Sequence, residues 1–260
     1  MFEQEIEKYE EAVATYMEVV AGPMGEEQYR QRAEILFSCH SCAIEGNTFT
    51  VDDTRALFEQ GLGYYPVGKS LFECQEMADH FAAYEWMHTH LDHPFDVELL
   101  QTINRLVTLN TLAYKAKDAK PGDFTTVDMA AGDTLFGDHE VLVARVPALM
   151  ASTAQAMAEG KQHPLVLAAR FHGFYEYLHP FRDGNGRTGR LLSNFILLQF
   201  GKPEFIIRKE DRQQYVSALR QIRTEHTDEY LISFFLNKAT EQLEDDIRQK
   251  RKAVPPVFIF

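Results

Sequence analysis

Residues that could do chemistry on a phosphate are concentrated in one segment, HPFRDGNGRTGR, which runs from His179 to Arg190. His179 supplies an imidazole, a group whose unperturbed pKa of about 6.5 suits a general base. Asp183 supplies a hard oxygen ligand of the kind that Mg²⁺ takes when nucleotide phosphates share the ion. These two residues predict transfer of a phosphate-containing group to a hydroxyl.

The glycines and arginines of this segment predict a loop that binds phosphate. Gly184, Asn185 and Gly186 permit backbone angles that turn consecutive N–H groups into one concavity, and such a nest at the start of a helix binds anions. Arg187 and Arg190 fall in the first turn of the next helix, where a cation opposes the helix dipole. Guanidinium groups at this place are explained if they bind a polyphosphate bidentately.

Two other phosphate-binding motifs fit the segment poorly. Gly184, Gly186 and Gly189 match the GxGxxG string of dinucleotide-binding proteins, but that fingerprint follows a β-strand, whereas this segment follows a helical pattern. A Walker A loop is excluded for the segment because it contains no Gly-Lys-Ser/Thr sequence. The plain alternatives, a histidine at a helix end and a Gly-Asn-Gly turn, do not explain why all these residue types occur together.

Helical patterns flank the segment and must position it. Pro180 cannot continue the preceding helix, so the loop begins there. The loop is therefore predicted to be held at both ends by buried helices. Apolar stripes at helical spacing lie before it (Leu167, Phe171, Phe174, Tyr175 and Leu178) and after it (Leu191, Phe195 and Leu198).

The rest of the chain predicts an all-α fold, because apolar residues recur at spacings of three and four almost throughout. The exception is 124–142, where Thr and Val lie on both sides of a Gly132-Asp133 turn and predict a short β-hairpin or flap. The expected helices cover 3–20, 26–44, 51–61, 70–91, 96–117, 143–158, 164–178, 187–200, 210–223 and 228–249.

The segment HPFRDGNGRTGR resembles the signature of the Fic family, HPFx(D/E)GNGRxxR, with every fixed position present. The resemblance covers about 94–243 and implies the Fic fold, a helical bundle with a hairpin flap. Proteins of this kind mostly move AMP from ATP to a Ser, Thr or Tyr hydroxyl of a target protein. We therefore expect an N-terminal helical region over 1–93, a catalytic core over 94–243 and a tail over 244–260.

The resemblance also implies roles for single residues. His179 would deprotonate the target hydroxyl, and Asp183 would bind Mg²⁺ between the α- and β-phosphates of ATP. The loop residues would hold phosphates: Gly184, Asn185 and Gly186 the α- and β-phosphates, and Arg187 and Arg190 the outer ones.

Target and adenine recognition are implied in the same way. The flap over 124–142 would align the target's backbone by strand addition. Tyr215, in a segment that resembles the wall of the family's adenine pocket, is the candidate ring contact. The alternative is that Tyr215 is an ordinary core aromatic of an amphipathic helix.

An upstream motif resembles the family's inhibitory sequence, (S/T)xxxE(G/N). It comprises Ser41, Glu45 and Gly46, on the expected 26–44 helix and the turn that follows it. By resemblance, Glu45 would pair with Arg190 and occupy the guanidinium that otherwise holds the γ-phosphate. The alternative is a plain helix terminus with Gly46 just beyond its last turn.

Two rival functions stay open. In some members of the family, the inhibitory glutamate positions water to remove AMP from a modified protein. A nucleotide-binding regulatory module without turnover is the other rival, and the complete set of His179, Asp183, Asn185 and Arg190 argues against it.

Composition limits the partners and the compartment. The 260 residues include 26 Lys and Arg and 39 Asp and Glu, a net charge of −13, which argues against nucleic acid and anionic membranes as partners. Cys39, Cys42 and Cys74 are too few for a disulfide scaffold, which favours a reducing compartment, and we expect Cys39 and Cys42 to be buried apolar residues. No signal peptide and no apolar run near 18–20 residues is apparent, so a cytoplasmic protein is expected. The tail RKAVPPVFIF could pack on the body or on a second copy, which leaves a homodimer open.

Overall fold

The computed structural model describes residues 2–63, 65–131 and 134–253, and over these residues the predicted all-α class is confirmed. The only sheet among them is a two-stranded hairpin. The helices are α1 (Glu3–Tyr16), α2 (Gly22–Met24), α3 (Glu26–Ile44), α4 (Val51–Gln60), α5 (Leu71–Thr89), α6 (Val97–Thr108), α7 (Leu112–Lys115), α8 (His139–Val143), α9 (Val146–Glu159), α10 (Pro164–Leu178), α11 (Asn185–Gln199), α12 (Arg212–Thr224) and α13 (Glu229–Ala253).

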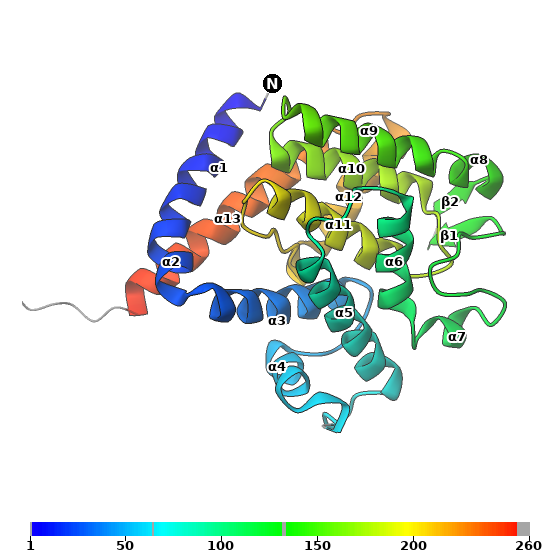
Figure 1. The fold of residues 1–260 in the computed structure, drawn as a ribbon, viewed down its shortest axis with the longest axis horizontal. Coiled ribbons are helices and arrows are strands. Elements are labelled where there is room, and N and C mark those ends of the chain that lie inside the picture. The colour runs from blue at the N-terminus through cyan, green and yellow to red at the C-terminus, as the bar shows by residue number, and fades with distance from the viewer. Residues whose placement is uncertain (1, 64, 132–133, 254–260) are drawn as a thin grey trace, which may run out of the picture.

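Helices α10 and α11 form the centre of the bundle (Figure 1). Helices α9, α12 and α13 pack around α10, and α3, α5 and α6 pack on α11. Helix α1, at the N-terminus, lies along α13, so the first and the last helix of the described chain are side by side (Figure 1). The loop between α10 and α11 is thus enclosed by elements from both halves of the sequence.

One hydrophobic core runs through the predicted domain boundaries. It extends from Tyr9 in α1 to Ile247 in α13, and includes residues of every long helix except α4. The expected division at 93/94 therefore separates parts that share a core, and the expected division at 243/244 falls inside the continuous helix α13. A smaller cluster lies between α3, α4 and α5. Its members, two of the three free cysteines among them, are Cys42, Phe49, Leu57, Cys74 and Met77.

Several element boundaries differ from the prediction for local reasons. The first helix passes through Gly22-Pro23 by way of a π-helical turn (Met17–Ala21) and stops at Gly25, whose φ of 80° is left-handed. Proline is tolerated there because it falls in the first turn of α2, where its missing N–H breaks no helical hydrogen bond. The expected 96–117 helix is divided into α6 and α7, and α8 precedes the expected 143–158 helix.

The segment His139–Glu159, which covers α8 and α9, contradicts the expectation that no apolar run approaches membrane-spanning length. Its most apolar stretch of 18 residues has a mean hydropathy of 1.3 and is 22% buried. The segment is long and apolar enough to cross a membrane by length and composition only, and six alanines supply much of its apolar character. Arg145 lies between the two helices, and Val146 and Met150 face the core.

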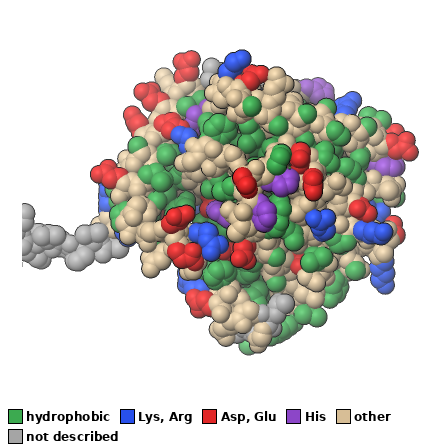
Figure 2. All heavy atoms as spheres, in the orientation of Figure 1, with side chains coloured by type: hydrophobic (Ala, Val, Ile, Leu, Met, Phe, Trp, Pro, Cys, Tyr) green, Lys and Arg blue, Asp and Glu red, His purple; other side chains and the backbone are tan. Residues whose placement is uncertain are grey.

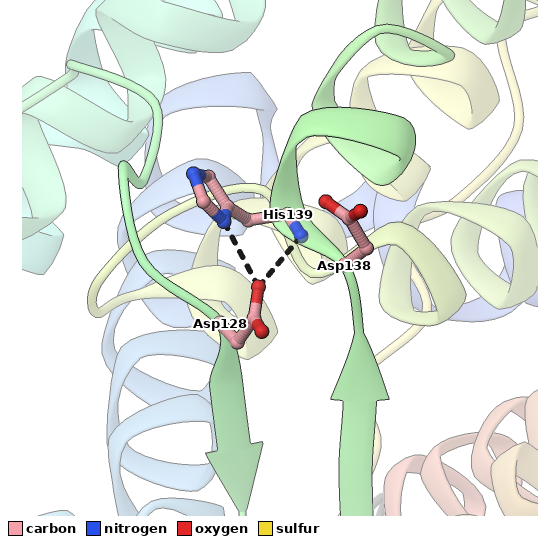
Figure 3. Close-up of side chains that lie close together, drawn as sticks. All are labelled: Asp128, Asp138 and His139. Atoms are coloured by element: carbon pink, nitrogen blue, oxygen red, sulfur yellow. Dashed lines mark hydrogen bonds and ion pairs between the residues drawn. The ribbon is translucent and has the colours of Figure 1, made fainter.

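The predicted flap is present. Strands β1 (Met129–Ala131) and β2 (Thr134–Gly137) pair antiparallel, and the predicted Gly132-Asp133 turn lies outside the described residues. The backbone N–H of Thr125 donates to the Pro180 carbonyl over 2.8 Å, which ties the chain before β1 to the signature loop. At the base of the hairpin, Asp128 accepts from both the backbone N–H and Nδ1 of His139, each at 2.9 Å (Figure 3).

On the face drawn in Figure 2, acidic and basic side chains of the described residues are interspersed with hydrophobic ones. The predicted packing of the tail over 254–260 lies outside the described residues.

Candidate active site

The signature loop is shaped by its two ends. Helix α10 ends at His179, whose φ of 46° is left-handed, and Pro180 follows. Gly184 begins α11 with a φ of 77°, and a Cβ added there would lie 2.6 Å from Cγ2 of Thr108. Only glycine therefore fits at this position, both by conformation and by space.

Asn185 braces the loop from inside. Its Oδ1 accepts from the backbone N–H of Phe181 at 3.0 Å, and its Nδ2 donates to the Phe181 carbonyl at 2.8 Å. The Asn185 side chain therefore braces the loop, and its predicted role as a phosphate ligand stays a prediction. The buried ring of Phe181 anchors the loop in the core.

A cavity of about 420 Å³ opens beside the loop, in the size range of small-molecule sites, about 300–1,000 Å³. The predicted residues His179, Gly186, Arg190, Glu45 and Tyr215 all line it. Four arginines and two glutamates face it, so its charge favours a polyanion. The remaining lining residues are Ile44, Thr134, Phe136, Glu176, Tyr177, Arg212, Val216, Leu219, Arg220 and Arg223.

The imidazole of His179 lies between the flap and α10. Phe136 of β2 stacks on it, with ring centroids 3.8 Å apart and planes at 19°. The guanidinium of Arg223 lies over the Phe136 ring, 4.4 Å from its centroid. Glu176, one turn earlier on α10, has Oε2 3.6 Å from Nδ1 of His179.

Asp183 is held between two cations. Its carboxylate accepts from Nζ of Lys115 at 3.0 Å and from the guanidinium of Arg187 at 2.9 Å. Burial alone would raise the pKa of Asp183, but these two charges lower it, so the group is a carboxylate. The Lys115 side chain is 43% exposed, and its ammonium can therefore move aside for another cation.

Arg187 does not fit the predicted role of a phosphate ligand. Its side chain is 1% exposed and lies behind the loop, where it pairs with Glu76 of α5 and with Asp183, each at 2.9 Å. It also donates to the Val107 carbonyl at 3.2 Å. Its guanidinium therefore links the signature loop to α5 through buried ion pairs. Arg190 is the arginine of the signature that lines the cavity.

The predicted contact between Glu45 and Arg190 is present. Oε1 of Glu45 accepts from Arg190 at 2.8 Å, and the same guanidinium donates to Oγ of Ser41 at 3.0 Å and to its carbonyl at 2.8 Å. Gly46, with φ 108°, ends α3 just beyond Glu45, so the plain helix terminus and the arginine contact occur together.

The Glu45 carboxylate also lies directly against the loop, because a Cβ added at Gly186 would collide with it. It thus occupies space at the N-terminus of α11, where an anion is favoured. Burial alone would lower the pKa of Arg190, but the adjacent Glu45 carboxylate raises it above its ordinary value. NH1 of Arg190 is buried and has no hydrogen-bond partner among the described residues.

Tyr215 is both a core residue and a cavity residue. Its side chain is 2% exposed, and its hydroxyl makes a 2.5 Å contact with Nε2 of His172. The ring lines the cavity together with Val216 and Leu219, which gives one wall an apolar character. The two interpretations of Tyr215 are therefore compatible.

Sequence reasoning missed several residues of the site. Glu176 could have been found, because three residues before His179 is one helical turn. Arg212, which donates to the Ile44 carbonyl at 2.8 Å, carried no local signal.

Residues 63–70, GYYPVGKS, match the Walker A pattern GxxxxGK(S/T), which the reading of the signature segment did not cover. This segment follows helical structure instead of a strand, and Lys69 binds Thr48 and Asp53, so it is no phosphate loop.

Comparison with known proteins gives consistent results. Residues 94–197 match the model of the Fic/DOC family. A protein adenylyltransferase Fic from Nematostella vectensis is 29% identical over 245 residues, 92% of this chain and 55% of that relative. A Fic domain containing signaling protein from Bacteroides thetaiotaomicron has a TM-score of 0.81 at 22% identity and covers 95% of this chain and 98% of that one. IbpAFic2 covalently tethered to Cdc42 has a TM-score of 0.54 at 17% identity and covers 92% of this chain and 70% of that one. The chain spans about half the length of the Nematostella relative.

Proposed function

The chain belongs to the Fic/DOC family, and from this premise we propose that it is a protein adenylyltransferase. It would transfer AMP from ATP to a Ser, Thr or Tyr hydroxyl of a target protein. The observation that carries the proposal is the cavity that brings His179, Gly186 and Arg190 together beside an apolar wall. A base, an anion site and a surface for a flat ring are what this reaction requires.

Each group of site residues would have a separate task in the reaction. Nε2 of His179 would accept the proton of the attacking hydroxyl. The backbone N–H groups at the start of α11 and the Arg190 guanidinium would hold the phosphates and stabilise the departing pyrophosphate. Tyr215, Val216 and Leu219 line the part of the cavity suited to adenine.

Mg²⁺ is part of the proposal, and Asp183 is its protein ligand. A single carboxylate fits an ion that takes its other ligands from water and substrate phosphates. The Lys115 ammonium already contacts this carboxylate, which supports a preference for a cation at this place. Bound Mg²⁺ would neutralise phosphate charge.

We further propose that Glu45 autoinhibits transfer. Its carboxylate engages Arg190 and lies against Gly186, both of which would otherwise face phosphates. The flap would align the target chain by strand addition. IbpAFic2, which shares the fold, has been captured covalently tethered to Cdc42. A cytoplasmic location and a homodimer belong to the same proposal.

Labelling separates this proposal from its rivals. We expect the Glu45→Gly variant, incubated with ATP labelled at the α-phosphate, to transfer label to itself or to proteins of a lysate. Label from the γ-phosphate should not be transferred. Release of AMP from a pre-modified protein, without transfer, would instead favour removal of AMP, and ATP binding without either reaction would favour a regulatory module.

A further inference from the structure

Glu176 and His179 lie close together at the cavity without forming a hydrogen bond. The 3.6 Å between Oε2 of Glu176 and Nδ1 of His179 exceeds a normal hydrogen bond, although the side chains are only 12% and 15% exposed. Neither Nδ1 of His179 nor Oε1 of Glu176 has a hydrogen-bond partner within the described part of the chain. Buried polar groups are normally paired, so this pair requires an explanation.

The surroundings keep Glu176 ionised. Burial alone would raise its pKa, but His179, His172 and Arg190 lower it below its ordinary value. From α12, Arg223 and Tyr215 also face the carboxylate. Helix α3 contributes Glu45 to the same cavity, whereas the flap contributes the uncharged Thr134 and Phe136. A carboxylate is a poor phosphate ligand, because both groups are negatively charged, which leaves the neighbouring imidazole as the natural partner of Glu176.

We infer that Glu176 is a positioning residue for the base, and this inference rests on the proposed function. Its carboxylate holds the proton of His179 on Nδ1, so that the lone pair of Nε2 is free for the target hydroxyl. A carboxylate that orients a catalytic imidazole in this way also stabilises the imidazolium that forms.

The transfer step explains why the negative charge of Glu176 beside His179 matters. The O–H bond of the target breaks and its proton moves to Nε2, while the oxygen forms a bond to the α-phosphorus. The bond from that phosphorus to the bridging oxygen breaks, and pyrophosphate leaves with the electron pair. His179 becomes positive at this moment, and Glu176 lies within ion-pair distance of it. Such contacts are often long without substrate and shorten in the complex.

The tautomer of His179 tests the inference without any turnover. We would record ¹⁵N shifts of the histidine rings against pH for wild type, Glu176→Gln and Glu59→Gln, and assign His179 with His179→Asn. Glu59 is exposed on α4 and serves as the matched control. Glu176→Gln should reduce the fraction of His179 that carries its proton on Nδ1, whereas Glu59→Gln should leave it unchanged. An unchanged tautomer in Glu176→Gln would overturn the inference.

Kinetics provide the second readout. In the Glu45→Gly background, Glu176→Gln should reduce kcat about ten- to hundredfold, leave the Kd for ATP within about twofold, and move the acid limb of the kcat/KM profile to lower pH. A loss of ATP binding, or an unchanged kcat, would contradict the positioning role. If Glu45→Gly itself transfers no label, the proposed function fails, and the ring titration still decides whether Glu176 controls His179.

Discussion

The ring of Phe136 lies nearly parallel to the imidazole of His179, 3.8 Å from centroid to centroid. Arg223 covers the flap aromatic at 4.4 Å, so an aromatic of the hairpin lies between a guanidinium and the candidate base. The flap therefore has a structural role besides the alignment of a target strand proposed for it. It fixes the plane of the imidazole.

We predict that Phe136→Ala reduces transfer about three- to tenfold, because stacked aromatic pairs contribute about 0.5–1.5 kcal/mol. The measurement is kcat for self-labelling in the Glu45→Gly background. Val141→Ala, at an exposed position of α8, should leave kcat unchanged. Equal kcat for Phe136→Ala and its parent would show that the stacking has no part in catalysis.

His179→Ala should abolish transfer and leave nucleotide binding nearly intact. The imidazole acts on the incoming hydroxyl and not on the phosphates, and removal of a general base costs about 10² to 10⁴ in rate. Calorimetry with ATP and labelling with the same protein sample check both halves. Lost ATP binding would assign His179 to the nucleotide site instead.

Asp183→Asn should make the remaining activity very low and insensitive to added Mg²⁺. It should also destabilise the fold by about 1–3 kcal/mol, because the buried guanidinium of Arg187 loses one of its two carboxylate partners. Thermal unfolding and a Mg²⁺ titration of activity measure the two effects. Asp118→Asn, at an exposed ion pair with Arg182, is the control. Normal Mg²⁺ dependence in Asp183→Asn would remove Asp183 from the metal site.

Glu45→Gly should raise self-labelling at least tenfold, since it frees Arg190 and the space beside Gly186. Arg190→Ala should not reproduce this gain, because it removes the phosphate-binding guanidinium together with the inhibitory contact. The two variants and wild type are compared side by side with labelled ATP. Equal labelling by wild type and Glu45→Gly would leave Glu45 as a simple helix end.

Glu34, on the same helix as Glu45, predicts a pH dependence of stability. Burial raises its pKa to about 7 from 4.5. A carboxyl whose pKa is raised on folding favours the folded state below the unfolded-state pKa, and this contribution is lost as pH rises from about 4.5 to about 7.

The difference in unfolding free energy between Glu34→Gln and wild type should therefore shift in favour of the variant between pH 5 and pH 8. The expected shift is on the order of 3 kcal/mol. Urea unfolding at both pH values measures the difference, with Glu59→Gln as control. A difference that does not change with pH would show that Glu34 titrates normally.

The sequence predicted best what neighbouring residues determine. The bounds of α3 and α10 agree with the expectation, because Gly46 and Pro180 end these helices and Pro164 begins α10. The burial of Arg187 could not be read in the same way. Its partner Glu76 belongs to a different helix, far away in the sequence, and only the packing of α5 on α11 brings the two together.

Asn185 shows the same limit at short range. Its residue type suits both an anion-binding turn and a brace, and only the positions of the Phe181 backbone atoms show that its side chain is a brace. Glu45 was recognised because the motif has a fixed spacing, but its proximity to Gly186 depends on where the end of α3 meets α11.

The packing of α3 limits how the inhibition proposed for Glu45 could be relieved. The helix buries Phe37, Ile35 and Ile44, and Arg32 fastens its first half to Asp246 of α13 with two hydrogen bonds. Exposing each such apolar side chain costs about 1.5–3 kcal/mol, so pulling the whole helix away would consume much of the stability of an ordinary domain. Turning the partly exposed Glu45 side chain breaks one ion pair. Under the proposed autoinhibition, activation would therefore need only a new rotamer of Glu45 or a shift of the last turn of α3, while the rest of the helix stays packed.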